Sequence, residues 1–148
     1  MNAKQEDANL ILRLYELRRD ETMRRARSWF LIKFNPQTVQ DIFALLSGEH
    51  SADFRMVASY WDMAAAFVNH GAIDEQMFND INTGHIGIYA KLEPFLAELR
   101  AIPGLPPYFY LKNLEPLVLR TPDAENRIAM MRRYMKNSAE SLVATELK

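Results

Sequence analysis

The stretch SADFRMVASYWDMAAAFVNHG, residues 51–71, decides the fold of this chain. Its apolar residues recur every three or four positions and form two neighbouring stripes, so that only a narrow strip of polar residues is left. A helix that is apolar over most of its circumference belongs inside a bundle of other helices. Ser51 suits the start of such a helix and Gly71 its end. We therefore predict that residues 52–70 form the central helix of the domain.

The segments on either side of this helix also show helical spacing, and none shows the sustained alternation of a strand. Residues 84–102 keep this spacing but contain Pro94, which removes one backbone hydrogen bond and predicts a kinked helix. Residues 6–33 predict either one long helix or two short ones with a break near Asp20. The fold class is therefore all-α.

We expect a single-domain helical bundle of about five to seven helices spanning residues 1–148, with residues 1–8 and 141–148 frayed. The chain has 148 residues, of which 49% are apolar and 25% charged, and these proportions are typical of one globular domain. Cysteine is absent, which excludes disulfides and thiolate metal ligands. No secretory signal or long apolar run is evident, so we expect a soluble, cytoplasmic protein without a membrane span.

Charge is unevenly distributed along the chain. Residues 1–36 carry a net charge of +3, residues 37–99 carry −7, and residues 100–148 carry +3. Two interpretations follow: the basic ends pack against the acidic middle, or a partner binds one of these surfaces. We favour the first.

No catalytic motif is present, and no catalytic residue is assigned. His50, His70 and His85 are not spaced as metal ligands on a helix. His50 falls in a predicted loop among polar residues, and His85 is expected to be a hydrogen-bonded residue of the core or its rim. There is no nucleophile elbow and no phosphate-binding glycine loop. We therefore expect no metal and no cofactor, and we favour a protein that is not an enzyme over an undetected enzyme.

A candidate pocket lies beside the predicted central helix. Asp62 is its most informative member, because a carboxylate on a mostly apolar helix indicates partial burial. A structural ion pair with Arg24, Arg25 or Arg27 is the interpretation that we favour for this residue. The candidate pocket residues are Trp29, Tyr60, Trp61, Asp62 and His85.

Two surface candidates remain. Tyr108, Phe109 and Tyr110 form an aromatic cluster that predicts either a partner interface or a loop packed over the core. A basic patch could follow a phosphate backbone, with Trp29 stacking on a base. Since Asp20 interrupts the patch, we favour a solvated face over nucleic-acid binding. The patch consists of Arg18, Arg19, Arg24, Arg25 and Arg27.

Six short motifs carry a family resemblance: LYELR at 14–18, ARSWF at 26–30, YWDM at 60–63, HGAIDE at 70–75, KLEPF at 91–95 and LKNLE at 111–115. Through them the chain resembles an uncharacterised family of small bacterial helical domains over about residues 10–120. The resemblance implies an all-helical domain of unknown function and supplies no catalytic residue. Some relatives of this kind carry an N-terminal membrane helix, which this chain does not show.

Three functions are compatible with the sequence. We favour a non-enzymatic protein-interaction or scaffold domain, with a partner protein or a second copy of the chain bound as a homodimer. The first alternative is a small-molecule-binding domain, or an undetected enzyme, with its pocket beside the central helix. The second alternative is nucleic-acid binding through the basic first helix.

Overall fold

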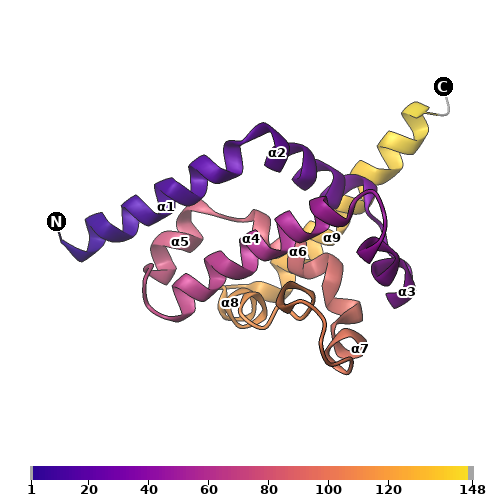
Figure 1. Ribbon diagram of the computed structural model, residues 1–148. Coiled ribbons are helices and arrows are strands. Elements are labelled where there is room, and N and C mark those ends of the chain that lie inside the picture. The colour runs from indigo at the N-terminus through magenta and orange to yellow at the C-terminus, as the bar shows by residue number, and fades with distance from the viewer. Residues whose placement is uncertain (1, 147–148) are drawn as a thin grey trace.

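The computed structural model describes residues 2–146, and its helices are arranged around a central one (Figure 1). The α-helices are α1 (Ala3–Arg19), α2 (Glu21–Ser28), α3 (Val39–Phe43), α4 (Ser51–Asn69), α5 (Glu75–Ile81), α6 (Gly84–Leu92), α7 (Leu96–Arg100), α8 (Leu114–Arg120) and α9 (Ala124–Glu146). The shorter helical turns are η1 (Trp29–Lys33), η2 (Ala44–Leu46), η3 (Glu93–Phe95) and η4 (Pro107–Phe109). No strand occurs in residues 2–146, which confirms the all-α prediction, although the helices outnumber the five to seven predicted.

Helix α4 is the centre of the bundle and confirms the predicted central helix. It contacts α2, α5, α6 and α8, so neighbours surround most of its circumference. Its apolar side chains are accordingly buried on several sides, and Phe54 and Trp61 are each only 1% exposed. One of the two apolar stripes of the sequence corresponds to this burial, whereas the other is exposed at Met63 and Phe67.

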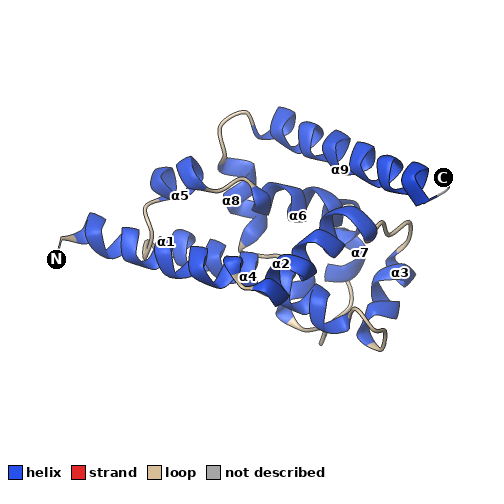
Figure 2. Cartoon of the chain, turned by 90° about the horizontal axis from the view of Figure 1, so that it is seen from above, coloured by secondary structure: helices blue, strands red, loops and turns tan. Residues whose placement is uncertain are grey.

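Helices α1 and α2 meet at a corner at Asp20. The Asp20 carboxylate accepts a hydrogen bond from the backbone N–H of Met23 at 3.3 Å and so caps α2. Its own backbone is extended, which ends α1 one residue earlier. The structure thus has two helices where the sequence left one or two open. The N-terminal end of α1 and the C-terminal end of α9 lie at opposite ends of the described chain (Figures 1 and 2).

The predicted kink at Pro94 is confirmed as a break between two helices. Helix α6 ends at Leu92, the 3-10 turn η3 contains Pro94, and α7 begins at Leu96. Proline has no N–H to donate and its ring crowds the preceding turn, so a regular α-helix does not continue through it.

Helix α9 lies along one side of the bundle and packs against α6 (Figure 2). Gly87 permits this close packing, because a Cβ there would lie 2.7 Å from Cε of Met131.

Helical structure also continues into the ends predicted to fray, from Ala3 to Glu146, while residues 1, 147 and 148 lie outside the described residues. None of the helices within 2–146 has the length and apolar character needed to span a membrane.

Candidate functional site

Helices α1 and α2 border three surface grooves of different chemical character. Helix α2 contributes to all three: Met23 lines one, Arg24 and Arg27 line another, and Arg25 lines the last. Candidate binding residues are therefore concentrated along α2.

One groove is lined mainly by arginines and is called the arginine groove. It has a volume of about 420 Å³. Four members of the predicted basic patch meet there, whereas the fifth, Arg25, lines a different groove. The residues of the arginine groove are Tyr15, Arg18, Arg19, Arg24 and Arg27.

Aromatic rings position two of these arginines. The guanidinium carbons of Arg18 and Arg19 lie 5.3 and 5.4 Å from the ring centroid of Tyr15. The Arg18 guanidinium also lies 5.7 Å from the ring of Trp61 and donates a hydrogen bond to Oδ1 of Asn82 at 2.8 Å. Cation–π contacts and hydrogen bonds of this kind restrict the movement of a guanidinium before any ligand binds.

The four guanidinium groups of the arginine groove have no ion-pair partner in the part of the chain that the structure describes. Nε of Arg27 is buried without a hydrogen-bond partner, while Nη2 of Arg27 donates to the carbonyl of Arg18 at 3.3 Å. Burial and then the charge of Arg18 lower the pKa of Arg27, Tyr60 opposes this, and Arg24 adds to the lowering. An anion in the groove would relieve this repulsion.

The two basic ends of the chain differ in how they meet the acidic middle. Nη2 of Arg120 lies 2.8 Å from a carboxylate oxygen of Glu75, and Nη2 of Arg132 lies 3.1 Å from one of Glu93. No ion pair of this kind joins the arginines of α1 and α2 to residues 37–99 in the described part of the chain. The pairing expected from the charge distribution therefore occurs at the C-terminal side and not at the arginine groove.

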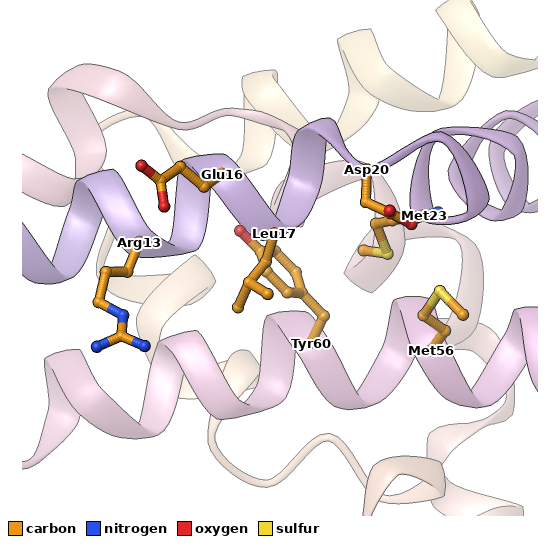
Figure 3. Close-up of a pocket in the computed structure, with 7 residues that line it drawn as sticks. All are labelled: Arg13, Glu16, Leu17, Asp20, Met23, Met56 and Tyr60. Carbon is orange, nitrogen blue, oxygen red and sulfur yellow. Dashed lines mark hydrogen bonds between the residues drawn. The ribbon is translucent and has the colours of Figure 1, made fainter.

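A second groove, the methionine groove, lies beside the central helix between the α1–α2 corner and α4 (Figure 3). Its volume is about 510 Å³, and Leu17, Met23 and Met56 supply apolar walls. The hydroxyl of Tyr60 reaches from α4 to α1 and donates to the carbonyl of Leu14 at 2.6 Å. Burial raises the pKa of Tyr60, against the opposing charges of Arg18 and Arg27. The complete lining is Arg13, Glu16, Leu17, Asp20, Met23, Met56 and Tyr60.

The third groove, the tryptophan groove, has a volume of about 590 Å³. The ring of Trp29 stacks on His50 and Phe34, with centroid distances of 4.5 and 5.0 Å. Nδ1 of His50 lies 2.8 Å from Oδ2 of Asp53. Sequence reasoning missed this arrangement, because His50 and Trp29 belong to separate elements and no periodic pattern relates them. The lining is Thr22, Arg25, Ser28, Trp29, Lys33, His50 and Asp53.

The structure does not bring the five predicted pocket residues into one cavity. Trp29 lines the tryptophan groove, and Tyr60 lines the methionine groove. Trp61 and His85 pack against each other in the core with ring centroids 5.6 Å apart. Asp62 is turned toward the start of α8.

Asp62 caps helix α8. Its Oδ1 accepts hydrogen bonds from the backbone N–H groups of Asn113 and Leu114 at 3.1 and 3.0 Å, and its Oδ2 accepts from the side-chain amide of Asn113 at 3.0 Å. The first turn of a helix leaves N–H groups unpaired, and a carboxylate satisfies them well. The expected ion pair with an arginine of α2 is not formed, because both carboxylate oxygens serve this cap.

His85 is buried among aromatic rings and lacks the hydrogen bond expected for it. Its side chain is 1% exposed, and neither ring nitrogen has a partner in the described residues. The ring contacts Trp61 and Phe78. Burial, with smaller contributions from the charges of Arg127 and Arg18, lowers the pKa of His85 to about 4. His85 is therefore neutral at neutral pH.

The aromatic cluster is mostly packed into the domain. Phe109 is 1% exposed and packs against Phe54, with ring centroids 5.1 Å apart. The hydroxyl of Tyr110 donates to the carbonyl of Ile102 at 2.6 Å and accepts from the N–H of Leu105 at 2.9 Å. Tyr108 is half-buried beside these residues. This geometry matches the alternative of a loop packed over the core.

Lys91 is a half-buried charge that sequence reasoning missed. Its Nζ donates to the backbone carbonyls of Phe30, Leu31 and Phe34 at 2.7, 2.9 and 2.5 Å. Burial lowers the pKa of Lys91 to about 8. The lysine satisfies carbonyls at the C-terminal end of η1 and so ties α6 to the N-terminal helices.

A further feature of the described residues is the placement of side chains that could bind a metal ion. Within residues 2–146 there is no group of three or more histidine and acidic side chains placed to hold an ion.

These features define an all-helical domain with an arginine-lined groove at the corner between its first two helices. A family model described as "Domain of unknown function (DUF4760)" matches residues 4–121, so this chain belongs to that family. The match confirms the family resemblance and includes the whole arginine groove, whereas α9 follows the matched region. Neither a curated protein nor a solved structure matches the chain significantly.

Proposed function

We propose that this domain is a non-enzymatic protein-interaction domain that binds an anionic segment of a partner protein in the arginine groove. The observation that carries this proposal is the convergence of four guanidinium groups without a carboxylate in ion-pair contact, in the part of the chain that the structure describes. Arginine recognises carboxylate and phosphate oxygens through its planar set of N–H donors.

The contacts of the arginine groove support binding rather than a purely solvated charge. Arg18 and Arg19 are held against Tyr15, so less side-chain entropy is lost when a ligand orders them. Arg27 lines the same groove, and its Nη2 donates to the carbonyl of Arg18. Nε of Arg27 is buried, so a ligand oxygen in the groove would meet the terminal Nη groups of this guanidinium.

The test is binding of an acidic peptide to the wild-type protein and to a double variant. Arg19 and Arg24 are exposed, so Arg19→Gln with Arg24→Gln should leave the fold intact. We expect the double variant to bind a fluorescent peptide of about ten glutamates and aspartates about tenfold more weakly. Arg133→Gln is the matched control, because Arg133 is exposed on α9 outside the groove. Equal binding by all three proteins would contradict the proposal.

A second copy of the chain is one possible partner, since residues 37–99 carry a net charge of −7. Light scattering coupled to size exclusion separates the two cases. A dimer at low salt that is lost in the Arg19→Gln, Arg24→Gln variant would identify the partner as this chain itself. A monomer that still binds the acidic peptide would point to a different protein.

A second candidate function rests on the methionine groove, which lies beside the central helix as a small-molecule site would. Its volume of about 510 Å³ falls within the range of ligand-binding pockets, and methionine walls adapt to apolar ligands. Methyl-labelled Met23 and Met56 provide the readout. We expect their NMR signals to shift together on adding a small apolar probe such as indole, while those of the exposed Met130 on α9 stay unchanged. Unchanged Met23 and Met56 signals would remove this candidate.

A further inference from the structure

We infer that the arginine groove recognises a phosphoryl dianion, carried by a phosphorylated side chain of the partner protein. This inference rests on the proposed function and specifies its ligand.

The first argument is the balance of charge. A carboxylate contributes one negative charge and two oxygens, which would leave most of the charge of four arginines uncompensated. A phosphorylated serine or threonine carries about −1.5 to −2 charges and three strong acceptor oxygens. The dianion therefore fits the number of guanidinium groups better than a carboxylate does.

The second argument is the number of free donors. Arg18 donates one N–H to Asn82 and Arg27 donates one to the carbonyl of Arg18, but each guanidinium has five. The side chains of Arg19 and Arg24 form no hydrogen bond within the described residues, so their guanidinium donors are available to a ligand. The three oxygens of one phosphoryl group can accept several of these donors at once, and a volume of about 420 Å³ accommodates such a group.

The third argument separates a single phosphoryl group from a nucleic acid. A nucleic-acid backbone needs a continuous track of positive charge for its successive phosphates. Here the charge is local, because Glu16 and Asp20 line the methionine groove on the other flank of the same corner (Figure 3). A polyanion that crossed the corner would meet these carboxylates. The whole chain also has a net charge of −1.

The experiment compares three peptides of about seven residues that differ only at the central position, which is phosphoserine, glutamate or serine. Binding is followed through the Nε–H NMR signal of Arg27 and by calorimetry. We expect the phosphoserine peptide to bind about tenfold more tightly than the glutamate peptide, and the serine peptide not to bind. The Arg19→Gln, Arg24→Gln variant should lose this binding, and Arg133→Gln should retain it.

The other outcomes are distinguishable. Equal affinity for phosphoserine and glutamate would overturn the phosphoryl inference but leave the anionic partner intact. No binding of either peptide, together with no binding of the acidic peptide described above, would overturn both. A short single-stranded oligonucleotide that binds more tightly than the phosphoserine peptide, with a steep dependence on salt, would overturn the inference in favour of a nucleic acid. Inorganic phosphate that binds as tightly as the peptide would overturn it in favour of the free ion.

Discussion

Asp62 on the central helix caps helix α8, and its Oδ1 accepts the backbone N–H of Leu114 at 3.0 Å although 52 positions separate the two residues. Helix α8 packs on both α4 and α6. One carboxylate therefore connects the middle of the bundle to its C-terminal half, and its importance is structural.

Replacing Asp62 with alanine should destabilise the domain. Asp62 is 9% exposed, and its loss would leave two backbone N–H groups and the Asn113 amide without their acceptor. We expect the free energy of unfolding in urea to fall by about 2 kcal/mol. The free energy of unfolding of Asp62→Asn should lie between those of the wild type and Asp62→Ala, because the asparagine side chain keeps one acceptor oxygen. Asp80→Ala, at an exposed aspartate on α5, is the control. An Asp62→Ala protein as stable as the control would contradict the cap.

The fold could be predicted where its cause is local in the sequence. The apolar stripes of residues 51–71 predict a central helix, and Pro94 predicts an interruption. For residues 6–33 the sequence left one helix or two open, with Asp20 as the place of a break. Each of these features depends on residues within a turn or two of one another. The number of helices was underestimated because two predicted helical segments are each divided in the structure, residues 6–33 at Asp20 and residues 84–102 at Pro94.

The site could be predicted only in part, for a related reason. The arginines of the groove lie on two consecutive helices, so their proximity follows from the chain itself. The cap from Asp62 to Leu114 and the stack of Trp29 on His50 depend on how distant helices pack. Charge alone did not show which basic end would meet the acidic middle, because that too is decided by packing.

Acid should destabilise the domain through His85. Its pKa is about 4 in the folded state against 6.5 ordinarily. As the pH falls from 6.5 toward 4, the unfolded chain binds a proton that the folded chain does not, so the free energy of unfolding falls, by up to about 3 kcal/mol. His85→Phe should lose less stability than the wild type between about pH 7 and pH 4.5 in urea titrations. The exposed His70, changed to Gln, is the control. Identical losses in wild type and His85→Phe would refute this role.

A larger side chain at Gly87 should loosen helix α9. A Cβ there would lie 2.7 Å from Cε of Met131 and 3.3 Å from Cδ2 of Leu31. Gly87→Ala should have a small effect, because the end of Met131 can move and alanine favours a helix by about 1 kcal/mol. Gly87→Leu should separate α9 from α6 and speed proteolysis and amide exchange in α9, while α4 stays protected. Equal protection of α9 in both variants would show that the close approach is not needed.

Neutralising Arg24 should stabilise the domain in the absence of a ligand. Arg24 is exposed, it has no ion pair in the described part of the chain, and its charge acts unfavourably on Arg27. We expect Arg24→Gln to raise Tm by about 1 to 3 °C at low ionic strength, because it removes a repulsion between like charges. The gain should vanish in about 0.5 M salt, where such charges are screened.

Inorganic phosphate should raise Tm of the wild type more than that of the variant, since binding to the folded state stabilises it. Arg133→Gln is the control: it should not raise Tm, and phosphate should raise its Tm as much as that of the wild type. A Tm gain for Arg24→Gln that persists in high salt would mean that repulsion in the arginine groove is not its cause.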